Sequence, residues 1–453
     1  MSLKELYRNK WARFGFWAVL YILWVIWLGN YWWLFGLIPI FDGHITGKVK
    51  WLFWKKEYKQ GEKRNALLDW LDAIIFAVVV VTFINTFFFQ AFKIPSSSME
   101  SSLYTGDHLF VSKLAYGPKL PQTPLTLPFT HNVVGSRESY STLIQNDYRR
   151  LKGFGEVKTG DYVVFGFPHG DTVLVKDPAG DYYTYERILG REFTIKHYGP
   201  VKVRPSDKKD HYVKRCVAVA GDTLEIRDGQ VYVNSLPQEV WPGVQNSYKV
   251  VTDGNRINQK TLDKIGINVG ELTFYSTLPG SEGQSGYMDM PLTAEMLEKV
   301  ESLGNVISVT RNIDRYPPDY PDSDLTIFPF VSEYRWTRDN YGPLWIPEKG
   351  ETVELTMENL PLYERIITSY EGNVLEIKDG KIYINSEEAH SYTFKQDYYF
   401  MMGDNRHNSL DSRYWGFVPE DHIVGKPAVI WLSIDRNKKF PRNIRWRRFF
   451  KFV

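Results

Sequence analysis

The chain has 453 residues but only one cysteine, Cys216. A single cysteine excludes an intrachain disulfide, so the fold does not require an oxidising compartment. A lone thiol could act as a nucleophile, but a small buried hydrophobic residue is the more ordinary interpretation. The chain also lacks an excess of charge of either sign, since its formal net charge is +2. This balance argues against nucleic acid as a partner, because no general electrostatic attraction would exist.

Metal and phosphate chemistry lack support as well. The nine histidines and the single cysteine show no spacing typical of metal ligands. No glycine-rich phosphate-binding loop stands between a strand pattern and a helix pattern. We therefore expect neither a metal ion nor a cofactor.

Two long stretches lack any charged side chain. Residues 14–41 form an uncharged run of 28, and residues 73–92 form one of 20. A helix needs about 20 apolar residues to cross a bilayer, so the second run predicts one span. The first run is longer than the apolar core of a signal peptide and predicts an anchor. We expect one tilted helix, or a span that ends near Asn30 with the remainder in the interface; a tight re-entrant hairpin is the less favoured alternative.

Lysine and arginine residues gather between these two runs. They are Lys48, Lys50, Lys55, Lys56, Lys59, Lys63 and Arg64. The positive-inside rule places this loop, residues 42–72, in the cytoplasm. One span after it delivers the rest of the chain to the outer side. The N-terminal tail is also basic, so the side on which the N-terminus lies stays open. We predict a membrane anchor over residues 1–92 and an outer domain over residues 93–453.

The outer domain shows the short alternating and β-branched runs that are typical of strands. These runs are His108–Ser112, Asp161–Phe165, Tyr212–Val219, Thr223–Arg227, Gln230–Asn234, Val374–Lys378, Lys381–Asn385 and Val429–Ile434. Two Asp-Gly pairs, which begin at Asp228 and Asp379, each lie between two consecutive runs. Each pair predicts a hairpin. Thr293–Leu303 has the pattern of a short amphipathic helix. The outer domain is therefore predicted to be mostly β.

One of these hairpins is repeated. Residues 221–235 (GDTLEIRDGQVYVNS) and residues 372–386 (GNVLEIKDGKIYINS) match at a constant offset of 151 residues. We interpret them as a repeated hairpin; independent convergence of two ordinary hairpins is the alternative. Two copies are too few for a solenoid.

Three separate segments carry candidate chemistry. The serine-rich turn Lys93–Met99 directly follows the second span, and alone it would be read as a helix cap. Lys214 lies in the largely apolar run Tyr212–Val219, where burial would lower its pKa and favour the neutral form that a general base requires. Met402–Gly416 is dense in hydrogen-bonding side chains that could orient such a lysine.

In this order, the segments resemble the type I signal peptidase family. Pro95–Met99 resembles the nucleophile motif, and Gly160–Phe165 the following strand motif. Tyr212–Arg215 resembles the lysine motif, and Gly403–Gly416 resembles the final motif almost letter for letter. The resemblance runs from about residue 73 to residue 432, apart from insertions. It implies N-terminal transmembrane helices followed by a mostly β exocytoplasmic catalytic domain, with insertions around residues 117–155 and 236–395.

The resemblance also implies a role for each matching residue. Ser98 would be the nucleophile and Lys214 the general base of a Ser–Lys serine endopeptidase. The Ser98 backbone N–H and the Ser96 hydroxyl would form the oxyanion hole. Ser409 would hydrogen-bond the Lys214 amine and orient it. The remaining pair, Asp411 and Arg413, would hold the loop in place.

The substrates implied are signal peptides of exported preproteins, cut after small residues and bound as an added strand. The location implied is the bacterial inner membrane, with the catalytic domain on the periplasmic face and the lipid bilayer as a second partner. A catalytically inactive membrane-anchored β-domain that acts as a binding scaffold is the alternative from another class. A self-cleaving Ser–Lys repressor would need an N-terminal DNA-binding domain, where this chain has membrane segments.

Overall fold

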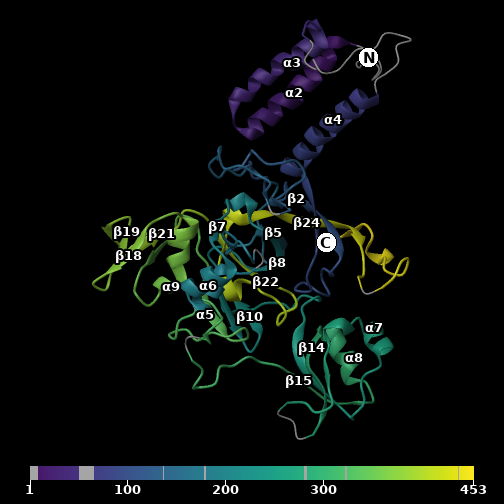
Figure 1. The fold of residues 1–453 in the computed structure, drawn as a ribbon, viewed down its shortest axis with the longest axis vertical. Coiled ribbons are helices and arrows are strands. Elements are labelled where there is room, and N and C mark those ends of the chain that lie inside the picture. The colour runs from purple at the N-terminus through teal and green to yellow at the C-terminus, as the bar shows by residue number, and fades with distance from the viewer. Residues whose placement is uncertain are drawn as a thin grey trace.

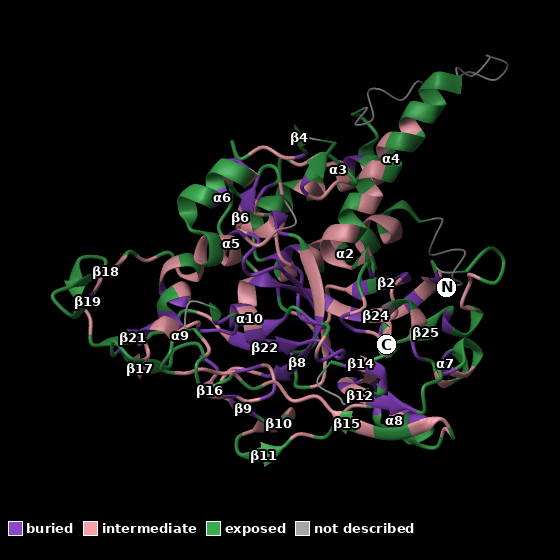
Figure 2. Ribbon diagram, turned by 60° about the horizontal axis from the view of Figure 1, so that its bottom comes forward, coloured by how far each residue is buried: buried purple, intermediate pink, exposed green. Residues whose placement is uncertain are grey.

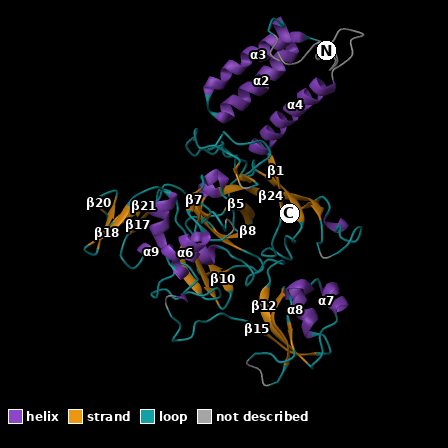
Figure 3. Cartoon of the chain, viewed as in Figure 1, coloured by secondary structure: helices purple, strands orange, loops and turns teal. Residues whose placement is uncertain are grey.

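The structure is a computed structural model that describes residues 9–49, 66–135, 137–177, 180–279, 283–321, 324–436 and 438–453. A group of helices stands above a body built mainly of strands (Figure 1). Coloured by secondary structure, the upper part is helical, whereas the body contains the strands together with several shorter helices (Figure 3). This arrangement confirms the predicted order, in which apolar N-terminal helices precede a mostly β domain.

The first uncharged run folds as two antiparallel helical arms. Helix α2 (Lys10–Leu28) ends at Gly29, which adopts a left-handed conformation with φ of 65°. The chain then turns back through η1 (Tyr31–Gly36), α3 (Leu37–Phe41) and η2 (Asp42–Thr46). The returning arm packs along α2, since the Tyr21 hydroxyl donates to the Trp33 carbonyl over 2.6 Å and Phe14 meets Phe41 edge-on. The expectation of one tilted helix is therefore wrong, whereas a helix end near Asn30 is confirmed. The chain reverses there, as in the hairpin that the sequence favoured least; Gly29 permits the reversal, and aromatic packing stabilises it.

The second uncharged run is helical in α4 (Ala66–Phe87), as predicted, but only as far as Phe87; its last residues, 89–92, belong to a strand. Among the described residues, α2 and α4 are the two helices long and apolar enough to cross a membrane. Most of the basic loop predicted between the runs lies outside the described residues. Helix α4 leads directly into the first strand of the body.

The central sheet has eight strands in the order β1-β2-β24-β5-β8-β22-β23, with β25 paired to β24. Their bounds are β1 (Phe89–Lys93), β2 (Asp107–Ser112), β5 (Tyr162–Gly166), β8 (His211–Ala218), β22 (Tyr398–Met402), β23 (Val418–Pro419), β24 (Ile423–Ser433) and β25 (Lys451–Phe452). All its pairings are antiparallel. The predicted strands in this sheet are confirmed to within a few residues at most ends, although β24 starts six residues earlier than expected.

Smaller sheets surround this one. They comprise β9 (Thr223–Arg227), β10 (Gln230–Val233), β11 (Leu236–Pro237) and β16 (Tyr341–Trp345); β17 (Thr352–Glu354) and β21 (Ser391–Thr393); β18 (Leu375–Lys378), β19 (Lys381–Ile384) and β20 (Glu387–Glu388); β6 (Thr172–Leu174) and β7 (Val201–Val203); and β3 (Val133–Val134) and β4 (Arg137–Glu138). The remaining helices that border them are α5 (Tyr182–Leu189), α6 (Arg191–Tyr198), α9 (Leu360–Arg365) followed by η6 (Ile366–Tyr370), and α10 (Ser412–Trp415).

A separate four-stranded sheet with its own core lies within residues 246–311 (Figure 1). Its elements are β12 (Asn246–Thr252), α7 (Gln259–Ile265), β13 (Phe274–Tyr275), β14 (Ser285–Leu292), α8 (Ala294–Glu301) and β15 (Val306–Arg311). Helix α8 confirms the predicted amphipathic helix, and Thr293 caps it by accepting from the Met296 N–H over 3.2 Å.

The two repeated hairpins form as predicted but lie in different surroundings. The first, β9–β10, is joined by β16 and buries Leu224, Ile226 and Val231 in the main core. The second, β18–β19, is extended only by β20 and leaves Ile377 52% exposed. Figure 2 shows β18 and β19 as an exposed projection.

Two apolar clusters contact the central sheet. One contains Val163, Phe165 and Cys216, and the other contains Leu109, Val164 and Ile430. Cys216 is fully buried, and burial raises the pKa of its thiol, as expected for a structural residue. The basic C-terminal tail folds back onto the same sheet, where Arg448 pairs with buried Asp107 over 2.6 Å.

Candidate active site

Ser98 lies in the turn that follows β1. The buried side chains of Ile94, Met99 and Leu103 anchor the turn in the core of the central sheet. It is fixed from the side by Asn405, whose backbone N–H donates to the Ser98 carbonyl over 3.1 Å. Ser98 itself is buried. The hydroxyl is therefore held by packing rather than carried on a free loop.

Lys214 reaches this hydroxyl from β8. Its Nζ donates to Ser98 Oγ over 2.6 Å, although 116 residues separate the two in the chain. Only 4% of Lys214 is exposed. Burial lowers the pKa of Lys214 to about 8, against the opposing charges of Asp411 and Asp404. This geometry matches a nucleophile beside a base that can be neutral near physiological pH.

A cavity of about 350 Å³ opens beside the pair. Apart from the serines and Lys214, its lining is largely apolar. It includes Phe92, Ile94, Leu109, Val164 and Val213. The β8 residues that border it, His211–Lys214, pair with β5 on one side. The partner on the other side, β22, begins its pairing only at Arg215, so the described strands leave this edge of β8 unpaired.

Ser96 lies close to the nucleophile, since the Ser96 and Ser98 hydroxyl oxygens are 3.4 Å apart. An oxyanion would form near both oxygens. A hydroxyl donor at this position could therefore meet it together with the Ser98 backbone N–H.

Asp411 and Arg413 form a fully buried ion pair within the Met402–Gly416 loop. Arg413 donates through Nε over 2.9 Å and through Nη2 over 2.8 Å, one bond to each carboxylate oxygen. Asp411 also accepts the Gly403 backbone N–H over 3.0 Å. Although burial alone would raise it, the charge of Arg413 holds the pKa of Asp411 below its usual value. These bonds tie Asp411 and Arg413 to Gly403; their supporting role stays a prediction.

Ser409 is in the site but does not make its predicted contact. Its Oγ is buried and has no hydrogen-bond partner among the described residues, so the expected bond to Lys214 is not formed. The Lys214 amine instead bonds to Ser98. Ser409 packs against Gly403, where an added Cβ would lie 2.1 Å from Ser409 Oγ and 2.7 Å from the Ser98 carbonyl oxygen. Only glycine fits at position 403.

The ion pair of Arg215 with Asp404 was not predicted. Arg215 donates to Asp404 over 2.8 and 2.6 Å, and both side chains are buried. Its guanidinium also lies over the rings of Tyr162 and Trp241, at 4.2 and 4.6 Å from the centroids. Both charged residues stand in the quoted motifs, next to Lys214 and Asn405. A count of buried charges of opposite sign could have suggested the pair.

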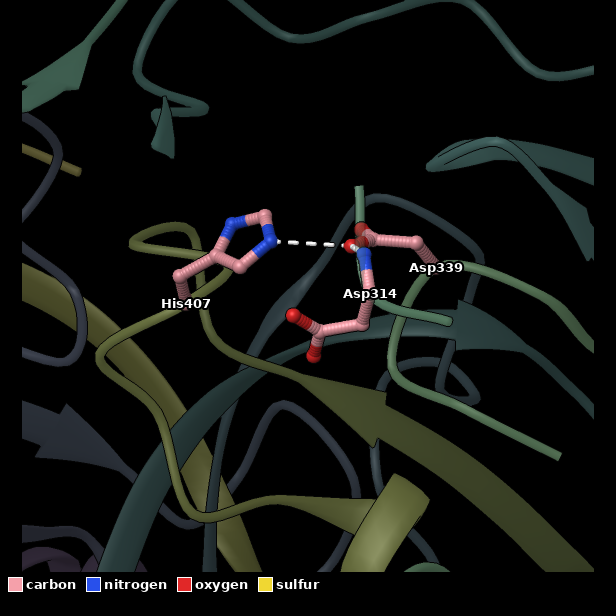
Figure 4. Close-up of side chains that lie close together, drawn as sticks. All are labelled: Asp314, Asp339 and His407. Carbon is pink, nitrogen blue, oxygen red and sulfur yellow. Dashed lines mark hydrogen bonds and ion pairs between the residues drawn. The ribbon is translucent and has the colours of Figure 1, made fainter. Parts of the chain in front are cut away.

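A cluster of possible metal ligands joins His407 of the Met402–Gly416 loop to Asp314 and Asp339 (Figure 4). The ring Nε2 of His407 donates to Asp339 over 3.0 Å, while Nδ1 accepts the Ser247 backbone N–H over 3.3 Å. Arg338 holds the Asp314 carboxylate through two hydrogen bonds. Because a donor meets Nδ1, the Asp339 carboxylate accepts from Nε2 and Arg338 holds the Asp314 carboxylate, the cluster fits a brace between the Met402–Gly416 loop and the inserted residues better than a metal site.

Comparison with known proteins gives matches along most of the chain. The family described as signal peptidase, peptidase S26, matches residues 67–265 and 354–432. A protein of Helicobacter pylori named signal peptidase I is 24% identical over 396 residues, covering 85% of this chain and 91% of its own length. Its namesake from Buchnera aphidicola of Acyrthosiphon pisum is 23% identical and covers 92% of each chain. A third, from Aquifex aeolicus, is 57% identical over only 42 residues, 9% of this chain and 16% of its own.

Proposed function

The chain belongs to the signal peptidase family, peptidase S26, and from this premise we propose that it cleaves signal peptides from preproteins with Ser98 as nucleophile and Lys214 as general base. The family makes it a serine peptidase, so the inactive binding scaffold is not favoured. The observation that carries the assignment of the two residues is the 2.6 Å contact between Lys214 Nζ and Ser98 Oγ in a buried setting.

The lowered pKa makes Lys214 useful as a base. A lysine with the usual pKa near 10.5 is neutral in about one molecule in three thousand at pH 7. With the pKa lowered to about 8, roughly one molecule in ten carries a free amine. Burial therefore supplies several hundred times more of the active form than an exposed lysine would.

The reaction proceeds in two halves. Neutral Lys214 takes the Ser98 proton while Ser98 Oγ attacks the peptide carbonyl. The Ser98 backbone N–H and the Ser96 hydroxyl donate to the resulting oxyanion, and protonated Lys214 gives its proton to the leaving amine. Lys214 then activates a water that hydrolyses the acyl-enzyme. The Asp411–Arg413 pair holds the loop against Ser98, and Ser409 fills the space beside Gly403.

The cavity beside Ser98 supports a substrate bound in extended form. Its apolar lining suits small apolar side chains next to the cut, and the unpaired edge of β8 at His211–Lys214 can accept a further strand. The substrate would thus be held by main-chain hydrogen bonds, with selectivity left to the cavity.

The helical arms suggest a topology for the anchor. Because the returning arm runs back along α2, the residues that precede α2 and those that follow η2, both basic in sequence, belong on one side of the membrane. The positive-inside rule makes that side cytoplasmic. Helix α4 then crosses once, so residues 93–453 lie on the periplasmic face of the bacterial inner membrane and residues 1–92 form the anchor.

Cleavage of a model preprotein in detergent tests the assignment. Ser98→Ala and Lys214→Ala should each abolish cleavage, and Ser96→Ala should lower kcat roughly 100-fold or more through loss of one oxyanion donor. Lys209→Met is the matched control, because burial also lowers the pKa of Lys209 to about 8 but His422, not a serine, lies beside it. Retained cleavage in Ser98→Ala, or equal loss in the folded Lys209 variant, would refute the dyad.

A further inference from the structure

The two repeated hairpins share more than their turns. The short strands β11 and β20 follow β10 and β19 at the same offset of 151 residues. Near the start of each copy, a backbone N–H donates to the side chain of the asparagine that follows the second strand. The bond runs from Thr223 to Asn234 over 2.8 Å and from Val374 to Asn385 over 2.9 Å. The two copies are therefore one three-stranded unit built twice, and they can be compared residue by residue.

The copies differ at the outer edge of their first strand. In the first copy, β16 pairs along β9 and places Tyr341 opposite Ile226, which is only 3% exposed. The equivalent residue of β18 is Ile377, which is 52% exposed. Across the described part of the chain, no strand pairs with β18 on that side. The edge that the chain fills for itself in one copy is open in the other.

Ile377 lies at the open edge of an apolar face. Its partner across the hairpin, Ile382, is buried, and the next pair on the same face, Leu375 and Ile384, packs against the main core. Because side chains of one face recur at every second residue, a strand added beside β18 would continue this face. An open strand edge is a template for pairing with another chain. Figures 1 and 2 both show β18 and β19 at the outer end of a projection.

The charges beside Ile377 allow β18 to pair with another β18. Glu376 precedes Ile377 and Lys378 follows it, and the two form an ion pair over 2.7 Å. In an antiparallel pair centred on Ile377 of two copies, Glu376 of each copy lies opposite Lys378 of the other. Centring the pair on either neighbour would put two like charges opposite each other. The strand is thus self-complementary in one register, as a two-fold interface requires.

We propose that two copies of this chain pair through antiparallel β18 strands centred on Ile377. The inference goes beyond the proposed function, since no residue of β18 lines the cavity beside Ser98. It rests on the proposed anchor for its strength. Four paired residues bury far less than the roughly 800 Å² per partner of a stable interface. The pairing therefore needs the high local concentration of two chains held in one bilayer.

Oxidative cross-linking of the full chain in phospholipid vesicles tests the pairing. Residues opposite each other in an antiparallel pair have Cα atoms about 4.5–5.5 Å apart, so Ile377→Cys should form a disulfide between copies. Glu387→Cys is the matched control, because Glu387 is exposed on β20, at the far edge of the same small sheet. Buried Cys216 would not react. We expect a cross-linked fraction at least fivefold larger at position 377; equal fractions would overturn the proposal.

Charge substitutions in the Ile377→Cys background test the register. Glu376→Lys alone or Lys378→Glu alone puts like charges opposite each other and should lower the cross-linked fraction at least threefold. A mixture of these two variants, carrying different tags, has opposite charges across the mixed pair and should recover the fraction. Loss without recovery in the mixture, or cross-links to an added preprotein instead of a second copy, would overturn the proposal.

Two parallel measurements separate this proposal from the proposed function. Flotation with the vesicles reports the anchor, and cleavage of a preprotein reports the activity. Protein that floats and cleaves without cross-linking refutes the pairing alone. Protein that does not float refutes the anchor and the pairing with it, whereas the catalytic assignment is judged by the Ser98 and Lys214 variants.

Discussion

Two neighbouring residues of β8, Lys214 and Arg215, show two ways to bury a positive charge. Consecutive residues of a strand point to opposite faces. Lys214 meets a neutral hydroxyl, and burial lowers its pKa to about 8. Arg215 meets the Asp404 carboxylate through two hydrogen bonds, and this pairing outweighs burial and raises its pKa. The unpaired charge is available for proton transfer, whereas the paired one stabilises the fold.

Removal of the partner of Arg215 should have the largest effect. Asp404→Ala leaves a buried guanidinium without its carboxylate, and we expect the free energy of unfolding to fall by about 3–5 kcal/mol. Chemical denaturation of the solubilised chain measures this loss. The double variant Asp404→Ala with Arg215→Met should regain part of the stability. A single variant as stable as the parent would contradict the contrast between the two residues.

Substitution of Lys214, on the other face of β8, should raise the free energy of unfolding. Lys214→Met removes a charge that burial opposes, so the inactive variant should be more stable at pH 7, by an amount on the order of 3 kcal/mol. Since the folded pKa lies below the unfolded one, the parent loses stability as pH falls from about 10.5 to about 8. The gain of the variant should therefore disappear above pH 10.5. Denaturation at pH 7 and pH 11 checks both points.

Cleavage should follow the ionisation of Lys214. The base is active when neutral, so kcat/KM should rise with pH and level off above about 8. We expect cleavage at pH 6 to be about 100-fold slower than at pH 9, with a slope of one per pH unit below 8. The Lys209→Met variant should keep the same profile. A pH-independent rate between 6 and 9 would exclude Lys214 as the titrating base.

The smallest expected effect concerns the rings that cover Arg215. Trp241→Leu removes one aromatic face at 4.6 Å from the guanidinium and should lower the free energy of unfolding by about 1 kcal/mol. The catalytic pH profile should not move, because Lys214 lies on the other side of the strand. A shift of that profile would show that the two faces are coupled.

The repeated hairpins show what local sequence could predict. Their strands and turns were predicted correctly, because alternation and the Asp-Gly turns at Asp228 and Asp379 are local signals. Their burial could not be predicted, since it depends on β16, whose residues are more than 100 positions from β9. The reversal at Gly29 was the less favoured alternative for a similar reason, because absence of charge alone does not distinguish one long helix from two packed arms.

The candidate site divides in the same way. Ser98, Lys214, Asp411 and Arg413 came from ordered motifs, and the structure brings them together. The predicted contact between Ser409 and Lys214 came from the resemblance alone. It is not formed, because the Lys214 amine bonds to Ser98 instead. Residue types and order identify the participants, whereas individual hydrogen bonds require coordinates.

The junction between α4 and β1 sets a length scale. The Phe88 backbone N–H still donates to Ile84 over 2.8 Å, and β1 begins at the next residue. Ser98 is only 11 residues beyond the last residue of α4. On the proposed topology, the short link between helix and strand fixes how far Ser98 lies from the end of the span, and therefore the distance from the bilayer at which a peptide bond could be cut.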